Sequence, residues 1–185
     1  MRNDLEDALE ARQNSKKVIS EAEIIGALDC MASEAALILS NRNPLILAVM
    51  HGGVFTAVEL CHRFDFAFEF EFIHLTRYGR SLKGGNLDWK VRPSYDLQGR
   101  TVLVVDDILD EGITLKAIHA ELEKCGVSKV YFAVLVKKKL KSFMERIDVD
   151  FLGVEIESNY LFGCGLDYKG YWRGLKALYA LDGSQ

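Results

Sequence analysis

The sequence predicts an α/β protein in which a central, mostly parallel sheet is flanked by helices. Four short, mostly apolar runs are expected to be strands, and they occupy residues 45–50, 101–105, 130–136 and 151–156. Segments of helical character precede or separate the first three runs, at residues 20–39, 54–63 and 113–124. Strands that alternate with helices in this way indicate a parallel sheet, whose ligands bind beyond the carboxyl ends of its strands.

The first long helix is marked at both of its ends. Ser20 is expected to be its N-cap, and Glu23, three residues later, completes a capping box. The apolar residues that follow with helical spacing are Ile24, Ile25, Leu28, Met31, Ala32, Ala35 and Leu39. The segment 41–44, Asn-Arg-Asn-Pro, is expected to end this helix.

The next elements are indicated by loops and by alternation. His51-Gly52-Gly53 forms a tight loop between the first apolar run and the helical segment 54–63. Gly126 is expected to end the helix 113–124 as a C-cap. A further strand is predicted from alternating phenylalanines, which give it one aromatic and one largely polar face: Phe66, Phe68, Phe70 and Phe72.

Three segments lie outside this strand–helix pattern. Residues 76–95 hold glycines, a proline and many charges, and a loop of this length is commonly functional or disordered. Residues 1–17 are polar and are expected to be a weak helix or a loose arm. The tail from Tyr168 onward carries aromatic and apolar residues and is expected to pack against the rest of the chain.

Length and composition limit the class of protein. The 185 residues, of which 49% are hydrophobic, suit a single domain over residues 1–185. The formal net charge of -4 gives no support for a nucleic-acid partner. No apolar run approaches the roughly 20 residues that a membrane span needs. The polar first residues do not resemble a signal peptide, so we expect a cytoplasmic protein with no membrane partner and free cysteines.

The segment 101–115 carries the strongest functional pattern. An apolar strand is followed by two adjacent acids, Asp106 and Asp107, then by a third acid, Asp110, and by a glycine and a threonine where a helix begins. The N-terminus of a helix presents unpaired N–H groups and the positive end of the helix dipole, so it can hold a phosphate. The paired acids can bind sugar hydroxyls directly or through a hard cation.

This segment resembles the motif with which type I phosphoribosyltransferases bind 5-phosphoribosyl-1-pyrophosphate (PRPP). From about residue 20 onward the chain resembles one branch, the hypoxanthine-guanine phosphoribosyltransferases. The resemblance implies the type I phosphoribosyltransferase fold, with a small hood built from N- and C-terminal segments. It also implies purine salvage with Mg2+ as cofactor, in which the phosphoribosyl group of PRPP moves to N9 of hypoxanthine or guanine. The products would be IMP or GMP and pyrophosphate, and the protein would be a homodimer or homotetramer.

The resemblance assigns roles to the residues of the motif. Asp106 and Asp107 would contact the ribose hydroxyls and Mg2+, and Asp110 would be the general base that accepts the purine proton near N7. The 5′-phosphate would be held, chiefly by backbone amides, in the segment Asp110, Glu111, Gly112, Ile113 and Thr114. The family often has Thr or Ser at the position of Glu111 and a polar residue at that of Ile113. These departures bear on side-chain contacts to the phosphate and leave the backbone cradle in place; Glu111 is expected to face solvent or a cation.

Two further segments resemble the pyrophosphate-binding parts of the family. Residues 50–53 resemble its pyrophosphate loop, where His51 stands at a position that is commonly Lys and the peptide before it is expected to be cis. Residues 76–79 resemble the opening of its mobile lid. The resemblance therefore implies that residues 76–95 are a mobile lid loop, which would close over the reactants and exclude water. The residues expected to bind the pyrophosphate are His51, Gly52, Arg77, Tyr78 and Arg173.

The purine site is expected at residues 159–168 and at the end of the strand 130–136. Lys137 matches the family lysine that donates to the purine 6-oxo group, and because a lysine only donates, it favours a 6-oxopurine over adenine. Tyr160 would stack on the base and Leu161 would meet its edge through the backbone. Asp167 would bind a second Mg2+ and approach a purine substituent.

Other functions remain open from the residues. A regulator of the same fold could bind PRPP or a nucleotide to control transcription, although no DNA-binding segment or basic face accompanies the motif here. A phosphoribosyltransferase for xanthine would have the same Lys137, since this residue suits any 6-oxopurine. A general nucleotide-binding protein is disfavoured because the sequence lacks G-x-x-x-x-G-K-[ST] and G-x-G-x-x-G.

Overall fold

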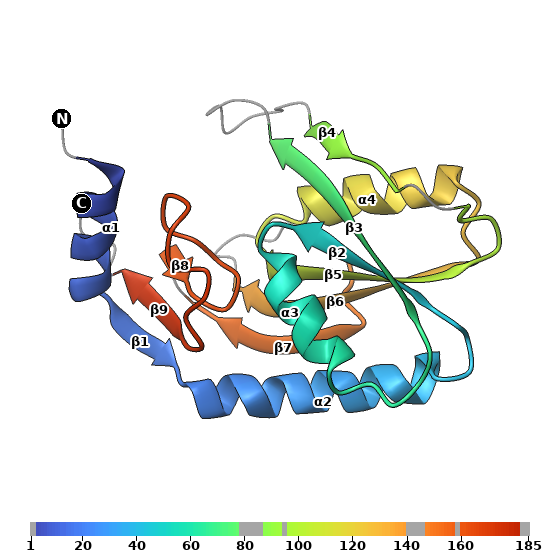
Figure 1. Ribbon diagram of the computed structural model, residues 1–185, viewed down its shortest axis with the longest axis horizontal. Coiled ribbons are helices and arrows are strands. Elements are labelled where there is room, and N and C mark those ends of the chain that lie inside the picture. Colours follow the sequence, from blue (N-terminus) through green and yellow to red (C-terminus); the bar gives the residue numbers. More distant parts are fainter. Residues whose placement is uncertain (1–2, 78–86, 94–95, 140–146, 158–159, 182–185) are drawn as a thin grey trace.

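The computed structural model describes residues 3–77, 87–93, 96–139, 147–157 and 160–181 (Figure 1). The helices in the described residues are α1 (Asp4–Gln13), α2 (Glu21–Leu39), α3 (Gly53–Cys61) and α4 (Ile113–Lys124). The strands are β1 (Lys16–Ile19), β2 (Leu45–Met50), β3 (Glu69–Arg77), β4 (Leu87–Val91), β5 (Thr101–Leu109), β6 (Lys129–Lys138), β7 (Phe151–Ile156), β8 (Tyr160–Phe162) and β9 (Leu178–Leu181).

The larger sheet confirms the predicted central, mostly parallel sheet. Its described strands follow the order β4-β3-β2-β5-β6-β7. Strand β2 runs parallel to β3 and β5, and β6 runs parallel to β5 and β7, whereas β4 is antiparallel to β3. The carboxyl ends of the five parallel strands therefore meet at one edge of the sheet, where a ligand site is expected.

Helices cover both faces of this sheet, and the alternation of side chains along β2 shows how. Ile46 and Ala48 belong to a buried cluster shared with apolar residues of α2 and α3. Leu45, Leu47 and Val49 belong to a second cluster, which includes residues of α4. Successive side chains of a strand point to opposite faces, so one apolar run supplies both layers of the core.

The predicted hood is confirmed as a second, three-stranded sheet of order β1-β9-β8 (Figure 1). The N-terminal β1 and the tail strand β9 pair antiparallel, with Lys16 opposite Ala180. Of the two expectations for residues 1–17, the described part forms helix α1 and β1 rather than a loose arm. Trp172 donates through Nε1 to the carbonyl of the buried Ala8 at 2.7 Å, and Lys169 forms an ion pair with Asp7.

The helix ends agree with the sequence in detail. Ser20 Oγ accepts from the amide of Glu23 at 3.3 Å, and the Glu23 carboxylate accepts from the amide of Ser20 at 2.8 Å, which completes the capping box. Gly126 follows α4 with a φ of 73°, the left-handed conformation expected of a C-cap glycine. Within the described part of the chain, no helix is both long and apolar enough to cross a membrane.

Several strands differ from the prediction. The segment 87–91, which was expected to belong to the loop over residues 76–95, forms β4 and pairs antiparallel with β3. Strand β3 begins at Glu69, so Phe66 precedes it and packs on Phe64 with ring centroids 4.7 Å apart. Strands β5 and β6 continue beyond Val105 and Val136, because the two strands remain paired there: Ile108 pairs with Val136 and Leu109 with Lys137. The acids of the motif therefore begin inside the strand, where backbone pairing fixes them.

Candidate active site

A cavity of about 340 Å³ opens at the carboxyl ends of β2 and β5. It is enclosed by the loop after β2, the end of β5, the first turn of α4 and one arginine of the hood. Its lining residues are Val49, Met50, His51, Gly52, Leu75, Asp106, Asp107, Ile108, Leu109, Asp110, Glu111, Gly112, Thr114, Leu115 and Arg173. The structure thus brings together most of the residues that the sequence nominated for PRPP and pyrophosphate.

The acid pair near the end of β5 combines a buried Asp106 with a half-buried Asp107. Asp106 is 7% exposed, and burial first, then the neighbouring Asp107 charge, raises its pKa well above the usual range. Burial also raises the pKa of Asp107, while a hydrogen bond from Asp106 and the charge of Arg173 oppose that rise. The Asp107 amide donates to Asp106 Oδ1 at 2.9 Å. Buried carboxylates whose ionised form is disfavoured are a site that a cation would stabilise.

The donor set at this acid pair fits Mg2+. Magnesium in proteins is commonly held by one or two carboxylates together with substrate phosphates, rather than by a full cage of side chains. Among the described residues, no group of three or more histidine, cysteine, aspartate or glutamate side chains could hold a metal ion. Two carboxylates facing a phosphate cradle are therefore suited to a metal that arrives with its phosphorylated substrate.

The loop after β2 lies directly against the acid pair. The peptide between Met50 and His51 is cis, as expected. A Cβ added to Gly52 would lie 1.7 Å from Asp107 Oδ2, and one added to Gly53 would lie 2.5 Å from the carbonyl oxygen of Val105. Glycine at both positions is what allows the loop backbone to reach the end of β5.

His51 is paired with a histidine that the sequence did not single out. The rings of His51 and His74 meet edge to face with centroids 4.6 Å apart, since Met50 and His74 are partners in the β2–β3 ladder. Burial lowers the pKa of His74, and the nearby His51 and Lys90 lower it further. The sequence does show a polar residue, His74, in the second half of β3. Only the pairing of β3 with β2 shows that it lies beside His51.

The N-terminus of α4 is open toward the cavity. Gly112 occupies the cap position with a φ of 78°, and no described side chain caps this helix. Its first amides are therefore available to an anion, as the phosphate-cradle interpretation requires. Thr114 and Glu111 line the cavity, whereas Ile113 is exposed.

The two lysines at the end of β6 have different partners. Lys137 Nζ lies 2.9 Å from Glu155 Oε1, and Lys138 Nζ lies 3.3 Å from Asp110 Oδ2. Lys137 is not among the residues that line the cavity described above. The sequence singled out Lys137 alone among three consecutive lysines, and the extension of β6 is what brings Lys138 to Asp110.

The hood contributes Arg173 and a set of purine-site candidates. Arg173 forms an ion pair with Asp167 and donates to the carbonyl of Gly165 at 2.7 Å. The Asp167 carboxylate is therefore engaged by an arginine of the hood. Leu161 is buried in β8, and Tyr160, half exposed, meets Tyr168 edge to face at 5.4 Å. Arg77 is the last residue of β3, and Tyr78 and most of the expected lid lie outside the described residues.

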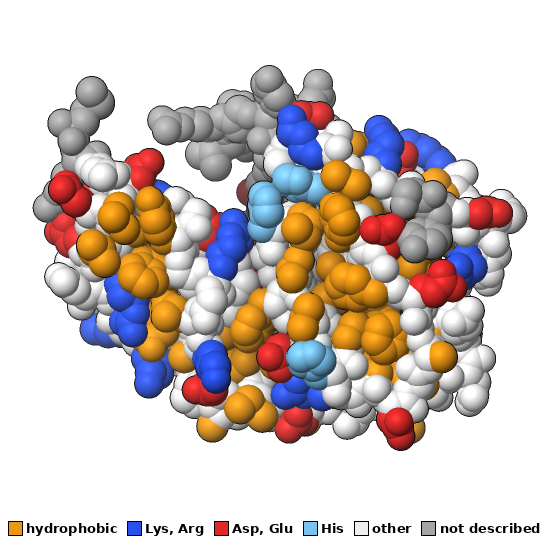
Figure 2. Space-filling view, in the orientation of Figure 1, with side chains coloured by type: hydrophobic (Ala, Val, Ile, Leu, Met, Phe, Trp, Pro, Cys, Tyr) orange, Lys and Arg blue, Asp and Glu red, His pale blue; other side chains and the backbone are white. Residues whose placement is uncertain are grey.

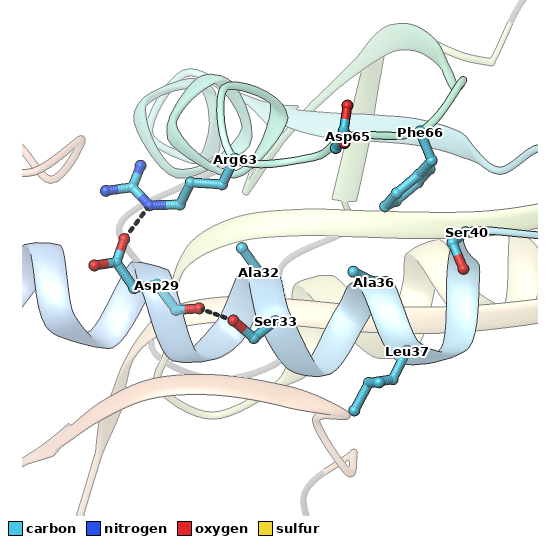
Figure 3. Close-up of a pocket in the computed structure, with 9 residues that line it drawn as sticks. All are labelled: Asp29, Ala32, Ser33, Ala36, Leu37, Ser40, Arg63, Asp65 and Phe66. Carbon is cyan, nitrogen blue, oxygen red and sulfur yellow. Dashed lines mark hydrogen bonds and ion pairs between the residues drawn. The ribbon is translucent and has the colours of Figure 1, made fainter.

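A second groove lies away from the strand ends (Figure 3). It runs between α2 and the segment after α3, and Arg63 crosses it to reach Asp29 at 2.7 Å (Figure 3). Arg63 also pairs with Glu59 at 2.7 Å. Its lining residues are Asp29, Ala32, Ser33, Ala36, Leu37, Ser40, Arg63, Asp65 and Phe66. The cation in this groove already serves to fasten α3 to α2, so we assign the chemistry to the cavity at the strand ends.

Known proteins resemble this chain in sequence and in fold. Residues 19–169 match the phosphoribosyl transferase domain family. A hypoxanthine-guanine phosphoribosyltransferase of Aquifex aeolicus (strain VF5) is 30% identical over 169 residues, which are 90% of this chain and 94% of that protein. A hypoxanthine-guanine-xanthine phosphoribosyltransferase of Tritrichomonas foetus is 27% identical over 178 residues, covering 96% and 92%.

Solved structures agree on the fold. A hypoxanthine phosphoribosyltransferase of Staphylococcus aureus is similar with a TM-score of 0.84 and 19% identity, over 98% of this chain and 96% of that one. One of Trypanosoma cruzi, in complex with the product IMP, gives a TM-score of 0.81 and 22% identity, over 91% and 94%. With the motif, the cavity and the hood in place, the chain belongs to the phosphoribosyltransferase family.

Proposed function

We propose that this protein transfers the 5-phosphoribosyl group of PRPP to N9 of hypoxanthine or guanine, in purine salvage. The observation that carries the proposal is the single cavity in which the buried acid pair, Asp110, the open N-terminus of α4 and Arg173 converge. Each group suits one part of PRPP: the acids its ribose, the helix its 5′-phosphate and the arginine its pyrophosphate. The relatives named for this activity support the same substrate class.

The roles of the side chains follow from their places. Asp106 and Asp107 would hold Mg2+ and the ribose hydroxyls, and the amides from Asp110 to Thr114 would hold the 5′-phosphate. Bound Mg2+ would neutralise negative charge on PRPP as pyrophosphate departs. The carboxylates would stabilise the positive charge that develops on the ribose at the same time.

Asp110 would act as the base. Its side chain stands where β5 ends and the phosphate cradle begins, and it is 47% exposed, so a purine can reach it. It would accept the purine proton near N7 while N9 attacks the anomeric carbon. A lysine at the end of β6 would donate to the 6-oxo group, and Lys137 is the one that the family motif nominates.

The loop after β2, the lid and the hood would complete the site. His51, Gly52 and Arg173 would bind the pyrophosphate, and we propose that Arg77 and Tyr78 join them from the lid. Tyr160 would stack on the base, and Leu161 would offer its backbone. Asp167 would bind a second Mg2+ only after exchanging its ion pair with Arg173.

An absorbance assay with PRPP and Mg2+ tests the proposal. Hypoxanthine, guanine, xanthine and adenine are offered separately, and we expect turnover with hypoxanthine or guanine and none with adenine. Xanthine is included because the Tritrichomonas foetus relative is named for xanthine as well as for hypoxanthine and guanine. Turnover with xanthine alone would mean that xanthine, and not hypoxanthine or guanine, is the substrate. A folded protein that binds PRPP but turns over none of the four bases would contradict the proposal and favour a regulator.

We also propose that the protein assembles as a homodimer or homotetramer. Val58 of α3 and Phe70 and Phe72 of β3 are exposed, and Figure 2 shows hydrophobic side chains gathered over these two elements. An apolar patch on one face commonly marks a protein contact. We expect Phe72→Glu to lower the mass measured by light scattering, while Leu37→Glu, on α2, leaves it unchanged. A monomeric wild-type protein would contradict the proposal.

A further inference from the structure

Helix α1 lies at the outer edge of the molecule and is fastened to the hood (Figure 1). Its Asp7 forms an ion pair with Lys169. The guanidinium of Arg12 lies over the ring of Tyr179 in β9, 3.9 Å from the ring centroid. A helix of 10 residues is only marginally stable by itself, so α1 depends on these contacts with the hood for its place.

Trp172 joins the same helix to a tight turn of the hood. Its Nε1 donates to the carbonyl oxygen of Ala8 at 2.7 Å, and Ala8 is fully buried. Tyr168 and Tyr171 close the turn before it by exchanging backbone hydrogen bonds of 3.0 and 2.9 Å. Trp172 itself has a φ of 71°, a left-handed conformation that a bulky residue keeps only where its surroundings hold it. The hydrogen bond to α1 supplies such a constraint on the side chain of Trp172.

The next residue along the chain is Arg173, the cation that the hood presents to the cavity. Its carbonyl oxygen accepts from the amide of Gly165 at 2.9 Å, and its side chain donates to the Gly165 carbonyl at 2.7 Å. Its positive charge acts on Asp107, whose pKa it lowers against the effect of burial. Because φ and ψ are the soft dihedral angles of the backbone, a different conformation at Trp172 would turn Arg173 away from the acid pair.

We infer that Trp172 is a positioning residue, through which α1 holds Arg173 in place for the pyrophosphate group of PRPP. This inference rests on the proposed function. An arginine whose backbone is already fixed loses less conformational freedom when it binds an anion, so its site binds more tightly. No described residue of α1 lines the cavity. The helix would therefore strengthen PRPP binding without touching PRPP.

Trp172→Phe tests the inference, because it keeps an aromatic ring and removes the N–H group that reaches α1. We expect the Kd for PRPP, measured by calorimetry with Mg2+ present, to rise about 10-fold, the loss typical of one hydrogen bond. The Kd for pyrophosphate should rise by the same factor, whereas kcat and the KM for hypoxanthine should keep their wild-type values.

Ala8→Leu changes the other partner of the same contact. A larger side chain has no room at this fully buried position, so it should displace α1 and weaken the binding of PRPP and pyrophosphate as Trp172→Phe does. This variant alters the outer edge of the molecule and leaves the residues of the cavity in place. It provides the same test if Trp172→Phe does not fold.

Two comparisons separate positioning from a structural role. In a protein that already carries Arg173→Met, Trp172→Phe should cause little further loss of PRPP affinity, because the residue through which it acts is gone. Lys176→Met is the matched control, since it removes an exposed ion pair between the C-terminal segment and Glu21 of α2. This control should keep the wild-type Kd for PRPP.

The outcomes distinguish the inference from the proposed function. If Trp172→Phe lowers the melting temperature but leaves the Kd for PRPP unchanged, the inference is wrong while the proposed function stands. The same holds if the effect of Trp172→Phe adds fully to that of Arg173→Met. A wild-type protein that binds PRPP but turns over no purine would overturn the proposed function alone, because the calorimetric comparison needs no turnover. A wild-type protein that binds no PRPP overturns both.

Discussion

Asp110→Asn is expected to lower kcat with hypoxanthine by about 10²- to 10⁴-fold, the range that a positioned general base contributes. The amide keeps the shape of the carboxylate but cannot take the purine proton. The KM for PRPP should change little, because the 5′-phosphate is expected to be held by backbone amides of the cradle, which the substitution leaves in place. Steady-state kinetics with PRPP and hypoxanthine varied in turn measure both quantities.

The same substitution should leave the fold intact. The Asp110 side chain is 47% exposed and its described partner is Lys138, and an ion pair this exposed contributes about 0–1 kcal/mol. Asp65→Asn is a matched control, because it removes an equal charge from an exposed residue of the second groove. Thermal unfolding should be similar for both variants. A near-normal kcat for Asp110→Asn would remove this residue from the role of base.

The parts of the fold and of the site that the sequence predicted are those that depend on residues close together in the chain. The capping box of Ser20, the strand at 45–50 and the helix N-terminus after Gly112 each follow from a few neighbouring residues. The acids of the motif all lie within the short segment from Asp106 to Asp110, so their convergence at the end of one strand needed no knowledge of distant contacts. The structure confirmed these elements with boundary shifts of a few residues.

The parts that the sequence missed depend on register between distant strands. His74 becomes a neighbour of His51 only because β3 lies parallel to β2 with Met50 opposite His74. Lys138 reaches Asp110 because β5 and β6 extend one another beyond their apolar cores. Periodicity along one segment does not contain this information, since a shift of one residue would turn every side chain to the other face.

The hood is a second feature that depends on contacts between distant parts of the chain. It also forms one side of the cavity. Its strands come from the two ends of the chain. The resemblance to the family, rather than any local pattern, predicted that these end segments form a hood, and their pairing as strands was not predicted. A Cβ on Gly165 would lie 2.2 Å from the carbonyl oxygen of Gly52, so the hood loop touches the loop after β2 backbone to backbone. Arg173, which donates to Gly165, is thereby held opposite the acid pair.

Gly52→Ala is expected to lower kcat/KM for PRPP by about 10²-fold, the cost typical of displacing a catalytic group by about 1 Å. The added Cβ would lie 1.7 Å from Asp107 Oδ2, so this carboxylate has to leave the position in which it would meet Mg2+ and the ribose. The backbone itself tolerates alanine, because Gly52 has a φ of -69°. The effect should therefore fall on the use of PRPP rather than on folding.

Gly26→Ala is the matched control for this substitution. Gly26 is exposed within α2 and has no atom within 4 Å of an added Cβ, so alanine there should keep full activity. It should also raise the free energy of unfolding by about 0.5–1 kcal/mol, because alanine favours a helix over glycine. Kinetics with varied PRPP and chemical unfolding of both variants distinguish the two effects. Normal use of PRPP by Gly52→Ala would mean that Asp107 can move without consequence, and the assignment of this carboxylate to the PRPP site would then be wrong.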